Sequence, residues 1–308
     1  MKRIKDYIRL MRPYQWVKNA FVFVPLIFSK NLLVIGLFYR SMLAFAAFSL
    51  AASAVYVLND IADKEFDKIH PIKRSRPIAA ERVGITEGWA LSILLFALSL
   101  FFLALISSAL AVSFVILGYV AINILYSFGL KRIVLIDLFV IASGFILRIL
   151  AGGYAIDVNV SSWLIMTTLF LSIFLAVAKR RSEFVLVTKG IDETTRKVLS
   201  DYDLGLIDQI LSISAASVII AYALYTVSER TVHAFHTEAL IFTTIFVTYG
   251  VFRYLYLVHK TGLGENPTKA LLTDKAMIVN TILFVVFVIA ILYKSELIRL
   301  FKGYVTLS

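Results

Sequence analysis

The stretch Asn59-Asp60-Ile61-Ala62-Asp63-Lys64-Glu65-Phe66-Asp67 stands where a long apolar segment meets a polar loop. On a continuing helix, Asp60, Asp63 and Asp67 have the spacing i, i+3 and i+7 and fall on one face. Carboxylates gathered on one face repel each other unless a cation lies between them, and such oxygen ligands suit Mg²⁺ together with substrate phosphates. The stretch therefore predicts a magnesium site at the end of an apolar helix. The alternative is a solvated acidic helix end.

A basic run, Lys73-Arg74-Ser75-Arg76-Pro77, follows the acidic stretch within a few residues. Arginine makes bidentate contacts to phosphate, and lysine adds a mobile positive charge. We therefore expect Lys73, Arg74 and Arg76 to hold the phosphates of a substrate that also binds the metal. Positive charges that only mark one side of a membrane are the alternative interpretation.

Composition places the chain among polytopic membrane proteins. Of its 308 residues, 60% are hydrophobic and only 17% are charged, which is far from the composition of soluble domains. The formal net charge of +11 is explained by loops on one side of a membrane, so we expect no nucleic-acid partner. With no cysteine, the chain has no disulfide, thiolate metal site or cysteine nucleophile.

The apolar segments predict an all-α bundle of nine transmembrane helices in a single domain over residues 1–308, because each span needs about 20 mostly apolar residues. The expected spans are 17–36, 41–59, 88–107, 110–128, 134–154, 161–179, 209–228, 238–257 and 276–294. Most Lys and Arg residues between spans then fall on one side, which predicts a cytoplasmic N-terminus and active site and an external C-terminus. The long loops 60–87 and 180–208 would form a cap on the cytoplasmic side.

Several polar residues at the predicted helix ends are further candidates for phosphate binding. Lys18 and Asn19 open the first span, and Asn19 lies inside its apolar run. Tyr126, Lys131 and Arg132 follow the fourth span closely. Each set serves equally well as an ordinary interfacial anchor, so both interpretations stay open.

Two basic features lie farther along the chain. Arg148 is the charge placed deepest in a span, and an intramembrane arginine predicts a functional site facing the bundle. Its partner is left open between Asp137, Asp157 and an anionic substrate, and Gly152-Gly153 one turn later predicts close helix packing. The sixth span ends in a basic group, which is a candidate diphosphate site or a topology signal. Its residues are Lys179, Arg180, Arg181 and Glu183.

Nine spans, with this acidic stretch after the second, resemble the UbiA-type intramembrane prenyltransferase superfamily along essentially the whole chain. Its first motif, NDxxDxxxD, is matched in full by Asn59, Asp60, Asp63 and Asp67. The resemblance implies that Asp60 and Asp63 bind Mg²⁺ bridged to a diphosphate, with Asn59 and Asp67 supporting them. It also implies a membrane-embedded transferase; a homo-oligomer and the chain length of the lipid are left open.

The second acidic motif of the superfamily is missing after the sixth span, where Ala178-Lys179-Arg180-Arg181-Ser182-Glu183 holds a single acid. Together with Arg12-Pro13-Tyr14-Gln15-Trp16-Val17-Lys18-Asn19, this resembles the decaprenyl-phosphate phosphoribosyltransferase branch. That branch implies transfer of 5-phosphoribose from 5-phosphoribosyl 1-diphosphate to a polyprenyl phosphate, with release of pyrophosphate, for cell-wall synthesis. A second basic group suits a donor that carries a 5-phosphate as well as a diphosphate.

Two other functions compete with this one. A prenyltransferase acting on an aromatic or other acceptor shares the fold and the metal but should carry the missing second motif. A transporter would use Arg148 and the acidic face as an ion path, but it should show inverted repeats and broken helices near the midplane. The polar clusters gather at one membrane face instead, and no P-loop, GxGxxG run or GxSxG elbow is present.

Overall fold

The computed structural model describes residues 2–70, 73–188, 202–261, 270 and 273–294 as helices and turns, with no strand among them. The described residues group into two compact units. The first unit contains 2–26, 34–70 and 73–160, and the second contains 27–33, 161–188, 202–261, 270 and 273–294. A single domain over 1–308 stays a prediction, and each unit is described by itself.

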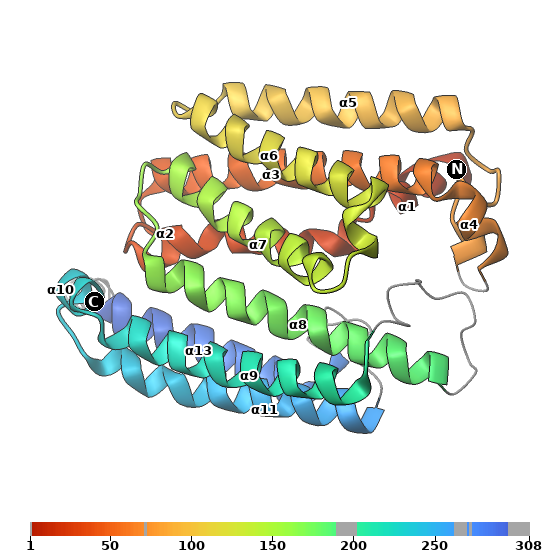
Figure 1. Ribbon diagram of the computed structural model, residues 1–308. Helices are drawn as coiled ribbons and strands as arrows, with labels where there is room; N and C mark the ends of the chain where they lie inside the picture. The colour runs from red at the N-terminus through yellow and green to blue at the C-terminus, as the bar shows by residue number, and fades with distance from the viewer. Residues whose placement is uncertain (1, 71–72, 189–201, 262–269, 271–272, 295–308) are drawn as a thin grey trace. The chain divides into compact units, whose positions relative to one another are not determined.

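The first unit is built around α3, with α5 and α6 beside it (Figure 1). Its elements are α1 (Lys2–Met11), η1 (Pro13–Phe23), α3 (Ile35–Ala62), α4 (Lys64–Ile69), η2 (Lys73–Ser75), α5 (Ile85–Ala104), α6 (Ala109–Phe128), η3 (Leu130–Arg132) and α7 (Ile136–Ala155). A further short helix, α2 (Val24–Phe28), is divided between the two units.

Small residues hold α3 against α5. Alanines of α3 are fully buried, and two serines of α5 donate hydrogen bonds to carbonyl groups of α3. Ser99 Oγ donates to the Ala47 carbonyl at 2.8 Å, and Ser92 Oγ donates to the Ala54 carbonyl at 3.2 Å. Such close approach and hydrogen bonding replace the hydrophobic effect, which does not drive helices together within lipid.

The close packing expected at Gly152 is confirmed where α7 meets η1. A Cβ atom added to Gly152 would lie 2.0 Å from the carbonyl oxygen of Val22. Only a residue without a side chain therefore lets α7 approach the η1 backbone, and this contact positions η1 beside the buried face of α7.

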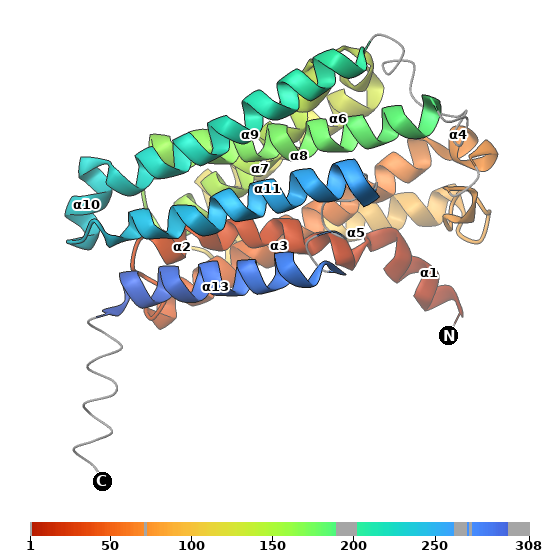
Figure 2. The ribbon, with the colours of Figure 1, turned by 90° about the horizontal axis from the view of Figure 1, so that it is seen from below.

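The second unit consists mainly of long helices that run side by side in both views (Figures 1 and 2). Its elements are α8 (Ser162–Thr188), α9 (Leu204–Val227), α10 (Glu229–Phe235), η5 (Ala239–Thr243), α11 (Thr244–Thr261) and α13 (Lys275–Leu292). Aromatic residues form its core, with Tyr222 donating to or accepting from Thr243 at 2.6 Å. Asp274 caps α13 by accepting from the Met277 amide at 2.9 Å.

Eight helices of the described residues are long and apolar enough to cross a membrane. They match eight of the nine predicted spans to within a few residues at most ends. The exceptions are the second span, where α3 begins earlier, at Ile35, and the sixth, where α8 runs on to Thr188. Helices are expected here because lipid cannot hydrogen-bond to the backbone, so each spanning segment must satisfy its own amide groups. The chain is an integral membrane protein with an all-α fold.

The predicted first span, 17–36, is wrong as a single long helix. Its residues form the 3₁₀-helix η1, the short helix α2 and a turn before α3 begins at Ile35. Pro25 has no amide hydrogen and cannot bond to the carbonyl of Phe21, which would break an α-helix at that point. The Val24 amide bonds to this carbonyl instead, and the chain continues in 3₁₀ geometry up to α2.

The predicted cap of loops is described only in part. Within 60–87, α4 and η2 form two short helical turns. Within 180–208, the helix α8 continues to Thr188, and 189–201 lie outside the described residues. A cap over the bundle therefore stays a prediction.

Candidate functional site

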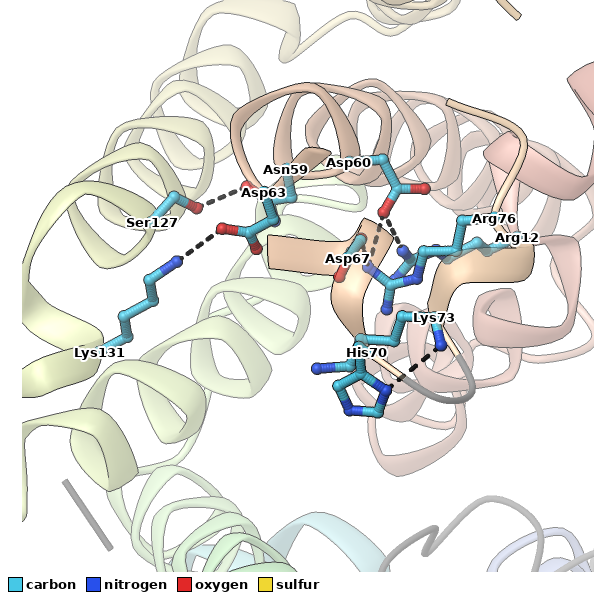
Figure 3. Close-up of polar contacts among 10 residues, drawn as sticks. All are labelled: Arg12, Asn59, Asp60, Asp63, Asp67, His70, Lys73, Arg76, Ser127 and Lys131. Carbon is cyan, nitrogen blue, oxygen red and sulfur yellow. Dashed lines mark hydrogen bonds and ion pairs between the residues drawn. The ribbon is translucent and has the colours of Figure 1, made fainter. Parts of the chain in front are cut away.

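The acidic stretch does not lie on one continuing helix, which corrects the sequence prediction. Helix α3 ends at Ala62, and Asp63 lies between α3 and α4 with φ −92° and ψ 7°. The break changes the direction of the chain, so the spacing i, i+3, i+7 no longer places the three carboxylates on one face. Asp60 and Asp67 meet at one place, and Asp63 has a different partner (Figure 3).

Asp60 and Asp67 converge on the guanidinium group of Arg76. Arg76 Nη1 donates to Asp60 Oδ1 at 3.0 Å and to Asp67 Oδ2 at 2.7 Å, and Arg12 Nη2 also donates to Asp60 Oδ1 (Figure 3). The two carboxylate side chains are only 3% and 4% exposed. Buried carboxylates are stable only when paired, so the two arginines make this arrangement possible.

Asp63 and Asn59 face α6 and η3 instead. Lys131 Nζ donates to Asp63 Oδ1 at 2.9 Å, and Ser127 Oγ donates to Asn59 Oδ1. The Asp63 side chain is 34% exposed, which makes it more open to solvent than Asp60 or Asp67. Lys131 thus contacts the acidic motif, and its role in phosphate binding stays a prediction. Tyr126 is half-buried on α6, and Arg132 ends η3, but its side chain lies outside the described set.

The residues of the basic run after the acidic stretch lie in different environments. Arg76 contacts the carboxylates, whereas the Lys73 amide donates to His70 Nδ1 at 3.3 Å and Arg74 is exposed on η2 (Figure 3). A substrate phosphate could approach Arg74 and Lys73 from solvent. Their roles in phosphate binding stay predictions.

Two lysines of α4 form ion pairs with Glu81. Lys68 Nζ lies 3.1 Å and Lys64 Nζ 3.4 Å from Glu81 Oε1, and Lys68 also pairs with Glu65 at 3.2 Å. Hydrogen bonds from Lys68 and Lys64 lower the pKa of Glu81, and those from Lys68 to Glu81 and Glu65 raise the pKa of Lys68. Both lysines are thus matched by nearby acids and add little surplus positive charge to the site.

Asn19 and Arg148 belong to one buried network inside the first unit. Arg148 Nε donates to Asn19 Oδ1 at 2.7 Å, Asn19 Nδ2 donates to Ser49 Oγ at 3.0 Å, and Arg148 Nη1 donates to the Gly144 carbonyl at 2.6 Å. Arg148 also lies over the rings of aromatic residues, 4.9 Å from the Tyr119 centroid.

In this network Arg148 has neutral partners, whereas Asp157, one of the partners left open, pairs with Arg40 at 2.5 Å. Among the residues that the structure describes, this network links η1, α3 and α7 through neutral partners of Arg148. Lys18 precedes Asn19 on η1 and is half-buried.

The basic group after the sixth predicted span lies on α8 in the second unit. Glu183 Oε1 lies 3.7 Å from Lys179 Nζ, which confirms that the two residues share a helix face, and Glu183 Oε2 accepts from Arg180. Arg181 Nε donates to Asp208 Oδ1 of α9 at 2.6 Å. Two acids thus offset much of the positive charge that the sequence indicates there.

Arg12 and Ser127 both contact the acidic motif, and neither was among the site residues predicted from the sequence. Arg12 adopts a left-handed conformation with φ 52° and ψ 56° directly before Pro13, a position where few non-glycine residues are found. Strain of this kind is commonly found at functional sites. The Arg-Pro pair in the sequence is a signal for a fixed turn, but not for its partner 48 residues away.

An apolar groove of about 420 Å³ runs between α3, α5 and α6 of the first unit. Its lining residues are Ala54, Val55, Leu58, Trp89, Ser92, Ile93, Phe96, Ala97, Leu100 and Val120. Leu58 directly precedes Asn59, and Val120 lies on the same face of α6 as Ser127, seven residues on. The groove thus approaches the acidic motif along two helices.

This fold and its acidic motif define an integral membrane protein of apolar helices, with a carboxylate–arginine cluster in its first unit. The UbiA prenyltransferase family model matches residues 23–183, about half of the chain. Decaprenyl-phosphate phosphoribosyltransferase of Corynebacterium glutamicum is 33% identical, over 93% of this chain and 86% of that protein. The protein of the same name from Mycolicibacterium smegmatis is 31% identical, over 89% and 88%. The chain belongs to the UbiA prenyltransferase family of membrane transferases.

The fold also matches a solved structure. A UbiA homolog from Archaeoglobus fulgidus, bound to GPP and Mg²⁺, aligns with a TM-score of 0.67 and 19% identity, over 93% of this chain and 99% of that chain. At this identity the match supports the common fold. Its bound Mg²⁺ raises the question of whether the residues of this chain suit the same ion.

The donor set at the acidic motif suits Mg²⁺. Among the described residues, no group of three or more His, Asp or Glu side chains is close enough to hold a metal alone. Mg²⁺ does not require such a group, because it is commonly bound by one or two carboxylates, water and substrate phosphates. Asp60 and Asp67 already converge on one positive charge, that of Arg76.

Proposed function

We propose that this enzyme transfers 5-phosphoribose from 5-phosphoribosyl 1-diphosphate to a polyprenyl phosphate and releases pyrophosphate, with Mg²⁺ as its cofactor. The observation that supports the substrates most directly is the similarity to decaprenyl-phosphate phosphoribosyltransferases, which extends over about nine-tenths of this chain. The absence of a second acidic motif on α8, where Lys179, Arg180 and Arg181 stand, agrees with it. In this proposal the active site and the N-terminus face the cytoplasm.

The roles of the residues follow from their positions. Asp60 and Asp67 would hold Mg²⁺, and Asn59 and Asp63, which face α6 and η3, would support them. These residues would place Mg²⁺ where it would offset the negative charge that builds up on the departing pyrophosphate. Arg76, which contacts Asp60, and Lys131, which contacts Asp63, would bind the diphosphate oxygens.

No strong general base is needed to activate the acceptor, because its phosphate is already ionised at neutral pH. Its oxygen attacks the anomeric carbon, and the bond from that carbon to the diphosphate oxygen breaks. The work of the protein is then to hold the donor and the acceptor in line and to exclude water. We assign part of the polyprenyl chain to the apolar groove between α3, α5 and α6, which approaches Asn59 and Ser127.

The test is an assay of the purified protein in detergent with radiolabelled 5-phosphoribosyl 1-diphosphate and a polyprenyl phosphate. Label should enter the lipid phase with Mg²⁺ and stay in water with a chelator. Asp60→Asn and Asp63→Asn should each lower the rate by about 100-fold or more, the size typical for lost charge stabilisation at a reaction centre. Asp157→Asn is the matched control, because Asp157 also pairs with an arginine, Arg40, away from the motif.

A second candidate is transfer of a prenyl group from its diphosphate to an aromatic or other acceptor. The structural neighbour that binds GPP and Mg²⁺ favours this reaction at the level of the fold. The same assay separates the two reactions when geranyl diphosphate and an aromatic acid replace the first substrates. Label transferred only from the prenyl donor would overturn the phosphoribosyl proposal.

A further inference from the structure

The carboxylates of the acidic motif are fully matched in charge by arginines of the same unit. Asp60 and Asp67 carry two negative charges, and Arg12 and Arg76 carry two positive ones, joined by three hydrogen bonds (Figure 3). Asp63 and Lys131 form a further neutral pair. The cluster therefore has no net charge left to attract a divalent cation by itself.

A divalent cation can reach Asp60 and Asp67 together only if it displaces the guanidinium group of Arg76, which bridges them. Displacement without another anion would leave two extra positive charges in a poorly solvated site, which is strongly unfavourable. A diphosphate changes this balance, because it brings the missing negative charge. It also offers oxygens that accept bidentate hydrogen bonds from the released arginine.

The two arginines differ in their freedom to move. The Arg12 side chain is 18% exposed, is fixed by the backbone turn before Pro13 and lies 5.2 Å from the centroid of the Tyr56 ring. The Arg76 side chain is 28% exposed and follows the short turn η2. Arg76 is therefore the one that can exchange partners while Arg12 stays on Asp60.

We propose that the Arg76 guanidinium occupies the position between Asp60 and Asp67 that a divalent metal would take. The metal replaces it there only when a diphosphate group binds and accepts hydrogen bonds from the displaced guanidinium. This inference rests on the metal–diphosphate site of the proposed function. By linkage, Arg76 makes metal binding and diphosphate binding depend on each other. Metal alone binds weakly, and the metal–diphosphate complex binds as one unit.

The test compares two affinities in the purified protein, with Mn²⁺ as a spectroscopic substitute for Mg²⁺. Electron paramagnetic resonance measures the binding of Mn²⁺ alone, and ³²P-labelled pyrophosphate measures the binding of the preformed Mn²⁺–pyrophosphate complex. In Arg76→Gln, the affinity for Mn²⁺ alone should rise while the affinity for the complex falls. Each change should be about 5- to 150-fold, the usual range of coupling between sites.

Two further variants control for folding and for charge. Arg76→Lys keeps the positive charge, so Mn²⁺ alone should bind as weakly as in the parent protein. Arg40→Gln removes an arginine whose Nη2 donates to Asp157 Oδ2 at 2.5 Å near the start of α3, away from the motif at its end, and should change neither affinity.

The outcomes separate the two levels of the argument. If the parent protein binds the complex but Arg76→Gln moves both affinities in the same direction or neither, the exchange role of Arg76 is overturned. If the parent protein binds neither Mn²⁺ nor the complex, the proposed metal–diphosphate site fails, and the inference fails with it.

Discussion

Replacing Gly152 by alanine tests whether the contact between α7 and η1 holds the first unit together. The added Cβ would lie 2.0 Å from Val22 O, 2.8 Å from its carbonyl carbon and 3.1 Å from its Cα. Ordinary contact begins at 3.4 Å, so the two backbones must separate by more than 1 Å. Overpacking of a tight interior typically costs about 1–3 kcal/mol, and backbone atoms that cannot rotate away place this site at the upper end.

Alanine also favours a helix over glycine by about 1 kcal/mol, which reduces the net loss of stability to about 2 kcal/mol. For a unit of this size, such a loss lowers the melting temperature in detergent by roughly 4–8 °C. The matched control is Gly118→Ala on α6, where an added Cβ meets no atom within 4 Å and only the helix preference changes. If Gly152→Ala melts at the same temperature as Gly118→Ala, the close contact does not contribute to stability and this reasoning is refuted.

Two other predictions concern single polar contacts. Asn19→Ala leaves the Arg148 guanidinium without its closest side-chain acceptor and should cost about 1–3 kcal/mol, measured as a lower melting temperature than that of the exposed control Asn159→Ala. Hydrogen bonds from Arg253 lower the pKa of Asp274, so this contact adds stability above the ordinary aspartate value of about 3.9 and loses it as the pH falls further. The gap in melting temperature between the parent protein and Asp274→Asn should therefore be widest at pH 7 and close below pH ~4; a constant gap would contradict the assignment.

The long helices were predictable because lipid leaves the backbone few choices. Apolar runs such as those of α5 and α6 must be helical to satisfy their amide groups, so their positions follow from hydropathy within a few residues. The segment 17–36 fails this rule. Averaged hydropathy overlooks Pro25, and it overlooks Asn19, whose amide finds partners on α3 and α7 through contacts that only the folded chain brings about.

The residues of the acidic motif were predictable from the sequence, but the contacts that they make with other residues were not. The motif from Asn59 to Asp67 marks the place, Arg76 was selected as a cation next to it, and Lys131 was selected only as a candidate for phosphate binding. Arg12 was not selected, because a residue 48 positions earlier reaches Asp60 only after α1 and η1 have packed against α3.

The break at Asp63 explains why the three carboxylates do not share one helix face, although their chemistry still suits a metal and a diphosphate. On a single helix the three carboxylates would lie in one row, and only a bound metal would offset their mutual repulsion. By ending α3 at Ala62, the chain turns Asp67 back toward Asp60 so that one arginine serves both, and it directs Asp63 to Lys131. The motif can therefore stay folded and buried without a bound metal. The same arginine then becomes the group that a metal and a diphosphate must replace together.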